Sequence, residues 1–523
     1  MAYNRRTFMA LKLTLLPLDP RPANPPETRP TQVFAWLDTM VKRNAVEAAR
    51  TIGDALAATN LVAMSDSRRL ELAEKYWATA SILWPKLESF FARATHPLAS
   101  DALGAAKAAV GLAQELSYAY KRLLDREANR RISFGRNKLL LTLIHRCLQT
   151  TDRVLINSYL SFAPVPPRTW LDAHRIYAFA RDRNLHDRPI GPDQADATPE
   201  NAYLRSLLLA LANPYGLRQG QLDTVLSYVQ EHSQWAKLTD VVPVHRMAKA
   251  VAIIPVGHDF PPFSASKGGS IEGSKIFLLA YDLAFQIQEQ IRQLETGGRY
   301  PASVNPDPPS RQQYLELLRR LLRQWAIPPA RQFNRLPSRA RVVLCTELRG
   351  VWQYSRGRHA GTAGPAIPMP PLTHCQVINH TPAGYALRHT DANPGAMRIG
   401  ELIALRVEGR TTLQVAMVRW FRNLLTGSGL EFGCEILSDK PEAATAASED
   451  QPDAKPAPVV VLPAELAKGD TEPALPQLVV AAGVFSVDQG IALTRGTETG
   501  FAVLTKLVEQ GPGFEIYDFA AVS

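Results

Sequence analysis

The feature that most constrains this chain is a change of hydrophobic period near residue 341. Before about residue 325, apolar side chains recur every three to four residues, as on one face of a helix; Phe34, Leu37 and Val41 are an example. From Arg341 onward, apolar and polar residues alternate, with Gly and Pro between the runs. A helical pattern cannot bury one face of a strand, so we expect a helical part followed by a β-rich part.

The first part predicts an all-α helical domain over residues 31–300 and a connecting helix over 301–330. An antiparallel bundle and an α-solenoid both fit this part, although no fixed-period repeat supports the solenoid. Within it, Val251–Val256 is a candidate lone strand, and we expect helix to resume at Ile276.

Residues 1–30 are expected to be a tail. Asn4-Arg5-Arg6 superficially resembles an export signal, but Lys12 interrupts the apolar run and Asp19 ends it. A short strand or an irregular segment is the better interpretation, and we expect a cytoplasmic protein. No apolar run approaches the length of a membrane span.

The second part predicts a six-stranded antiparallel β-barrel over residues 331–438. A polar, Pro- and Ala-rich stretch over residues 439–458 is expected to be a disordered linker. Residues 459–523 are expected to form a small C-terminal β-module, either separate or packed on the first barrel. The predicted fold class is therefore α + β and multidomain.

Sequence motifs for catalysis or metal binding are missing. The four cysteines show no paired spacing typical of a metal site, and we expect buried thiols. The Gly-rich stretch before Lys275 fails as a phosphate-binding loop because the lysine follows the serine instead of preceding it. We therefore expect no catalytic residue, no metal and no cofactor.

The net charge is +10, which raises the question of nucleic-acid binding. One basic helical run begins at Lys121-Arg122 and is interleaved with Asp125 and Glu127, so we favour a solvated helix face. A second candidate is the arginine-rich segment 311–341. Nucleic acid is not the partner we favour.

Three motifs stand in a set order at the start of the β-rich part. Arg335 and Arg339 form R-x-x-x-R just before the first predicted strand, a pattern that an arginine-rich chain also produces by chance. Asn379-His380-Thr381-Pro382-Ala383-Gly384 lies at a turn between two predicted strands. Val418-Arg419-Trp420, followed by Gly433, lies in a predicted closing hairpin.

In this order the motifs resemble the PilZ-domain family, bacterial receptors for the second messenger cyclic di-GMP. The resemblance covers about residues 331–438. It differs from the family pattern in two respects. Thr381 stands where the family usually has Ser, and a Gly- and Pro-rich insertion over residues 356–371 lengthens the spacing between Arg339 and Asn379.

The resemblance implies a non-catalytic signalling protein that binds cyclic di-GMP and relays the signal to an unidentified protein partner in motility, pilus or exopolysaccharide machinery. The implied ligand-binding residues are Arg335, Arg339, Asn379, Thr381 and Gly384, with Arg331 and Arg341 as further candidates. The arginines suit phosphate, guanine edges and stacking, and the amide and hydroxyl suit a guanine edge. The alternative is an adaptor or structural protein with a degenerate barrel that binds no nucleotide.

Overall fold

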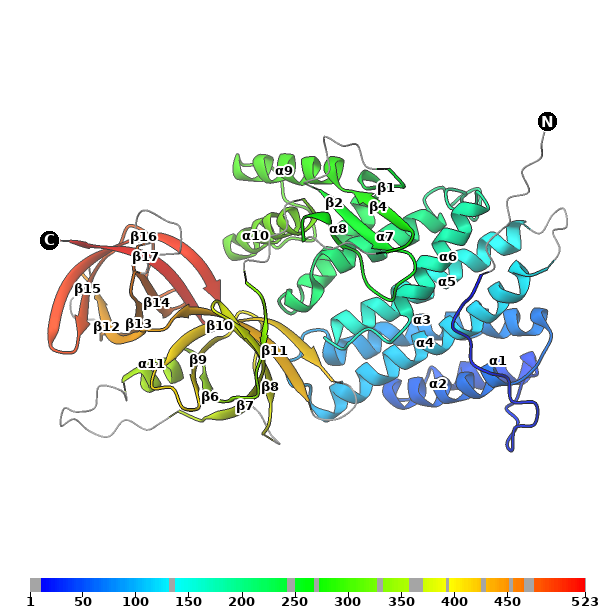
Figure 1. Cartoon of the computed structure of the whole chain (residues 1–523), viewed down its shortest axis with the longest axis horizontal. Helices are drawn as coiled ribbons and strands as arrows, with labels where there is room; N and C mark the ends of the chain where they lie inside the picture. Colours follow the sequence, from blue (N-terminus) through cyan, green and yellow to red (C-terminus); the bar gives the residue numbers. More distant parts are fainter. Residues whose placement is uncertain are drawn as a thin grey trace. The chain divides into compact units, whose positions relative to one another are not determined.

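The computed structural model describes residues 11–130, 137–241, 250–267, 272–326, 333–356, 370–391, 395–424, 429–450, 455–464 and 475–522. The chain divides into two compact units (Figure 1). The first unit runs to residue 331 apart from two short segments, 95–97 and 215–219. The second unit consists of these two segments and residues 332–523.

The described residues of the first unit between 30 and 232 are mainly helical, as the sequence predicts. Its helices are α1 (Pro30–Met40), α2 (Ala45–Leu61), α3 (Asp66–Phe91), α4 (Ser100–Ala128), α5 (Asn137–Leu160), α6 (Thr169–Asp182), α7 (Pro199–Leu211) and α8 (Gln221–His232). Two 3₁₀ turns follow α7 and α8, η1 (Pro214–Gly216) and η2 (Ser233–Trp235). Side chains cap several helix starts: the Asn44 amide oxygen accepts from two backbone N–H groups of α2, and Ser65 and Thr198 cap α3 and α7.

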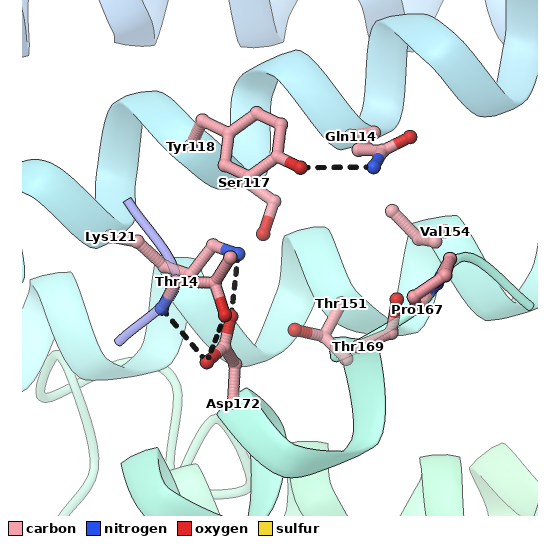
Figure 2. Close-up of a pocket in the computed structure, with 10 residues that line it drawn as sticks. All are labelled: Thr14, Gln114, Ser117, Tyr118, Lys121, Thr151, Val154, Pro167, Thr169 and Asp172. Carbon is pink, nitrogen blue, oxygen red and sulfur yellow. Dashed lines mark hydrogen bonds and ion pairs between the residues drawn. The ribbon is translucent and has the colours of Figure 1, made fainter. Parts of the chain in front are cut away.

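Helix α4 is the centre of this unit, because α2, α3 and α5 all pack against it. Its alanines at 105, 106, 109 and 113 are fully buried and allow the close approach of its neighbours. Our expectation of a solvated basic face on α4 is wrong at Lys121 and Arg122, which are 6% and 8% exposed. The reason is a buried carboxylate: the Lys121 ammonium lies 2.8 Å from Asp172 of α6 (Figure 2).

The expected all-α domain over residues 31–300 also contains a small sheet. Its strands are β1 (Lys237–Thr239), β2 (Val251–Pro255), β3 (Phe263–Ser264) and β4 (Lys275–Leu279), in the order β1-β4-β2-β3, with the 3₁₀ turn η4 (Ala265–Lys267) after β3. The strand at Val251 is confirmed, but it is not alone. Ile276 lies in β4 and pairs with Ile254, so the helix expected from Ile276 begins instead at Tyr281. Helices α9 (Tyr281–Glu295) and α10 (Pro308–Trp325) complete the unit.

The second unit begins with the predicted six-stranded antiparallel barrel. Its strands are β6 (Arg341–Thr346), β7 (Thr373–Thr381), β8 (Gly384–His389), β9 (Leu402–Val407), β10 (Gln414–Asn423) and β11 (Leu430–Ser438). They follow the order β7-β6-β9-β10-β11-β8, and pairing of β7 with β8 closes the barrel. A seventh short strand, β5 (Leu336–Pro337), pairs with β7. The sequence predicted neither β5 nor the helix α11 (Leu348–Arg356) that follows β6.

A second closed barrel of six strands forms the C-terminal part. Its strands are β12 (Glu442–Ser448), β13 (Ala457–Leu462), β14 (Gln477–Ala481), β15 (Gly490–Arg495), β16 (Glu498–Gly511) and β17 (Phe514–Val522). The expectation of a disordered linker over residues 439–458 is therefore wrong for Glu442–Ser448. This stretch pairs with β13 and β15, and inward-facing Ala444 and Ala446 join the barrel core despite their polar sequence surroundings.

Helix α11 lies between the two barrels (Figure 1). It contacts β6 and β9 of the first barrel and β12, β13 and β14 of the second. One buried cluster joins all three parts: Val351 and Tyr354 from α11, Met417 from β10, and Val460 and Phe514 from the second barrel. The Trp352 indole N–H donates to the Ala444 carbonyl, 2.7 Å away. The second barrel thus shares a core with the first.

All four cysteines are buried free thiols, as expected. Among the described residues, no helix is both long and apolar enough to cross a membrane.

Candidate functional site

The stretch from Arg335 to Arg341, here the lead-in segment, runs antiparallel beside β7. Leu336 pairs with His380 and Pro337 with Asn379. The Ser338 N–H donates to the Ile378 carbonyl at 3.3 Å, and the Val377 N–H donates to the Ala340 carbonyl at 2.9 Å. The first two predicted motifs, R-x-x-x-R and the Asn-x-Thr turn, therefore lie on neighbouring chain segments of one sheet.

A bulge in β7 brings the polar side chains of this strand to one face. Opposite β8, Gln376 pairs with Arg388 and Asn379 pairs with Ala386, with the register shift between Val377 and Asn379. Residues three apart on a regular strand face opposite sides, so the bulge is what puts Asn379 on the same outer face as Gln376. Thr381 is two residues beyond Asn379 and shares that face.

The arginine side chains of the lead-in segment are exposed to solvent. Arg335 is two residues before Pro337, the partner of Asn379, so in an extended chain it faces the same side as Asn379. Arg339 and Arg341 are also exposed, and Leu336 between the first two is 56% exposed. Among the described residues, no carboxylate pairs with the guanidinium group of Arg335 or Arg339. Both groups are therefore available to an anionic ligand.

The turn between β7 and β8 is a two-residue hairpin. Thr381 pairs with Gly384, and the Ala383 N–H donates to the Thr381 hydroxyl at 3.3 Å. The amide of Asn379 makes no hydrogen bond with the described residues and is partly exposed. A free amide and a turn hydroxyl thus lie beside the lead-in segment.

Gly384 is required by a close approach to the neighbouring strand. A Cβ atom on Gly384 would lie 2.2 Å from the Cys434 carbonyl oxygen of β11. In this structure, the close backbone approach at Gly384 is therefore made by the barrel wall. Burial also raises the pKa of Tyr385, whose hydroxyl donates to Gln414 at 2.9 Å.

The third motif closes the barrel through a ring packed on a glycine. Trp420 of β10 pairs with Gly433 of β11. A Cβ atom on Gly433 would lie 1.8 Å from the Trp420 indole nitrogen, so only glycine leaves room for the ring. This contact explains why a tryptophan on one strand and a glycine on the next occur together.

Of the two further candidates, only Arg341 can be placed, and two residues of the outer face were missed. Arg331 lies outside the described residues. Arg341 pairs with Gln376, which in turn pairs with Arg388 across β7 and β8. Gln376 and Arg388 thus extend the outer face next to Asn379, and strict alternation from the buried Cys375 and Val377 could have indicated Gln376. Arg388 is already paired with Glu431 at 2.6 Å.

Comparison with known proteins gives two family matches. Residues 31–244 match the family described as the N-terminal domain of the cyclic-di-GMP receptor FimW. Residues 353–443 match the family described as the middle PilZ domain of the same receptor. The second match begins downstream of Arg335 and Arg339, so it does not include the lead-in segment.

Among curated proteins, the cyclic-di-GMP receptor FimW of Pseudomonas aeruginosa is 22% identical over 482 residues, covering 79% of this chain and 77% of the relative. No solved structure matches the chain. The PilZ match falls on the first barrel, where the three motifs lie in the order that the PilZ-domain family shows. The first barrel of the chain is therefore a PilZ domain.

Proposed function

We propose that this chain binds cyclic di-GMP with the lead-in segment and the β7–β8 hairpin of its PilZ domain. The observation that carries the proposal is the pairing of Leu336 and Pro337 with His380 and Asn379, which places R-x-x-x-R beside the Asn-x-Thr turn. The name of the Pseudomonas aeruginosa relative supports the same ligand.

The chemistry of these groups suits a cyclic dinucleotide. Each guanidinium group of Arg335 and Arg339 offers a planar fork of donors, which can bind a phosphate or the O6 and N7 atoms of guanine. The same flat group can stack on a purine ring. The Asn379 amide offers both a donor and an acceptor to a guanine edge, and the Thr381 hydroxyl adds a third polar group.

The proposed role is that of a non-catalytic cytoplasmic receptor that passes the signal to a protein partner. Ligand bound to both the lead-in segment and β7 would hold residues 335–341 more firmly against the barrel, and a partner would respond to that population shift. Four unpaired cysteines are consistent with a reducing compartment. The motility, pilus or exopolysaccharide machinery remains the partner class that we propose.

Isothermal titration of the full chain with cyclic di-GMP tests the proposal. We expect saturable binding by the wild type and loss of at least about a hundredfold in affinity for the Arg335→Ala/Arg339→Ala variant, because two charge-assisted contacts are removed. Arg406→Ala, an exposed arginine on β9 of the same barrel, is the matched control and should bind as the wild type does. Equal affinity of the wild type and the double variant would overturn the site.

The alternative is a degenerate barrel that serves as an adaptor and binds no nucleotide. It predicts that cyclic di-GMP leaves the unfolding temperature of the full chain unchanged, whereas a ligand of the native state must raise it. Nucleic-acid binding by segment 311–341 has less support, since Arg319 is paired with Glu295 at 2.5 Å.

A further inference from the structure

Residues 11–18, here the strap, cross the helical unit as an extended segment without helix or strand assignment. Leu11 is buried and Leu13, Leu15, Leu16 and Leu18 are partly buried. The strap is joined to α1 by residues 19–29, here the tether. The sequence indicated an irregular segment or a short strand here, and the strap is an ordered, irregular segment.

The helices hold the strap chiefly by its main chain. The Thr14 N–H donates to the Asp172 carboxylate at 3.0 Å. Arg175 donates to the Lys12 carbonyl at 2.7 Å, and Arg122 donates to the Leu16 carbonyl. Donors and acceptors on the helices thus match the backbone of an extended peptide, as in recognition of peptides by their main-chain groups.

The site on the helices that holds the strap, here the seat, contains a buried carboxylate that needs the strap as a hydrogen-bond partner. Asp172 is 2% exposed, and its carboxylate accepts from Lys121, from the Thr14 N–H and from the Thr14 hydroxyl (Figure 2). If the strap leaves, Asp172 loses two of these three hydrogen bonds, and leaving a buried carboxylate short of partners is costly. The neighbouring polar cavity, which Thr14 helps to line, holds about 20 Å³, room for one water molecule.

The tether, by contrast, is weakly held. It contains four prolines, at 20, 22, 25 and 26, and most of its side chains are exposed. Among the described residues, the Asp19 N–H donates to the Leu61 carbonyl of α2 at 2.8 Å, and the other hydrogen bonds of the tether stay within it or reach the first turn of α1. The tether bends at residues 20, 21, 23 and 24 in this structure, and a Pro-rich segment of its length spans roughly 34 Å when extended, at about 3.1 Å per residue. It therefore lets the strap reach a seat outside its own chain.

We propose that the seat formed by Arg122, Asp172 and Arg175 is a peptide-binding site that takes the strap of a second copy of this chain. Two copies exchange their straps through the extended tethers, and each seat keeps all the hydrogen bonds that it has in one copy. Such reciprocal exchange of an identical element costs few contacts and is a common route to dimers. The exchange gives the helical unit a role in self-association that is independent of nucleotide binding.

The experiment uses the full chain in three forms: wild type, Thr14→Pro and Thr28→Pro. Thr14→Pro removes both the N–H and the hydroxyl that Asp172 accepts from, whereas Thr28→Pro makes the same change in the tether, outside the seat. Light scattering after size exclusion, from low to high micromolar concentration, should show a concentration-dependent dimer for wild type and Thr28→Pro. A monomer at every concentration for the wild type, or a dimer that persists in Thr14→Pro, would overturn the proposal.

A second experiment tests the same site if Thr14→Pro disturbs folding. A protease site inserted after Pro22 allows the tether to be cut once the full chain has folded, as checked by circular dichroism. A labelled peptide with the sequence of residues 11–19 should then exchange into the seat and raise fluorescence anisotropy, and the same peptide with proline in place of Thr14 should not. Failure of the unmodified peptide to bind the cut, folded chain would also overturn the proposal.

Discussion

At several positions of the PilZ domain, a contact with a neighbouring strand determines which residue type fits. Gly384 and Gly433 leave room for the Cys434 carbonyl and the Trp420 ring, respectively. Asn379 faces the solvent side because of the bulge after Val377. The residue types at these positions could be recognised in the sequence, but the neighbours that demand them could not, since strand pairing decides which atoms meet.

Gly384→Ala should destabilise the PilZ domain, because the added Cβ would lie 2.2 Å from the Cys434 carbonyl oxygen and the strands must separate. We expect a loss of about 2 to 4 kcal/mol in the free energy of unfolding, measured by urea denaturation. Gly500→Ala on β16 is the control, because a Cβ there has no atom within 4 Å. Equal stability of the two variants would contradict the strand contact.

Glu401 should make stability fall as pH rises. Burial, and then the nearby Glu347 carboxylate, raise the pKa of Glu401 from 4.5 to about 7. The folded chain holds this proton more tightly than the unfolded chain, so the stabilisation is full below pH 4.5 and is lost as pH rises through about 7. Between pH 5 and pH 8, this loss should lower the free energy of unfolding by about 2 to 3 kcal/mol, and Glu401→Gln should abolish it. Urea denaturation across this pH range measures the difference. Glu408→Gln, an exposed glutamate on the same barrel, should keep the decline.

At the scale of elements, the barrel strands were predictable and the additions to them were not. The six strands from β6 to β11 follow runs of alternating residues. Strand β5 has two residues, one of them proline, and no periodicity can identify so short a strand. Helix α11 was missed because Leu348, Val351 and Trp352 follow β6 directly and extend its apolar run.

Cyclic di-GMP should slow amide hydrogen exchange in the lead-in segment and at the β7–β8 hairpin. Both elements would contact the ligand, so opening either would require its release. At a ligand concentration of about one hundred times the dissociation constant, exchange at Ser338 and Ala383 should slow by up to about a hundredfold. Amides of β9, which is separated from β7 by β6, serve as the internal control. Slowing in β9 alone would contradict the proposed site.

At the scale of the whole molecule, the polar stretch over residues 439–458 was the least predictable. Its composition indicates disorder, yet Glu442–Ser448 complete a barrel because strands on both sides supply hydrogen-bond partners. The small sheet of the first unit was also missed for the most part, since its strands have two to five residues. The helical region, in contrast, follows directly from a sustained helical period.

The shared core predicts that the two barrels unfold together. Phe514 of the second barrel is 1% exposed and lies in the cluster that includes residues of α11 and the PilZ domain. Phe514→Ala should cost about 3 to 5 kcal/mol, and hydrogen exchange should speed up in β9 and β10 as well as in β17. Val522→Ala, 54% exposed on the same barrel, should have little effect. Faster exchange confined to the second barrel would show that its core is independent.

The central claim is that the lead-in segment and β7 hold one ligand together. A double-mutant cycle measures this most directly, with cyclic di-GMP titrated into the wild type, Arg335→Ala, Asn379→Ala and the double variant. The account predicts that each single change weakens binding about tenfold or more. It also predicts that the loss of binding free energy in the double variant differs from the sum of the two single losses, as it does for coupled contacts. Single variants that bind as tightly as the wild type would contradict it.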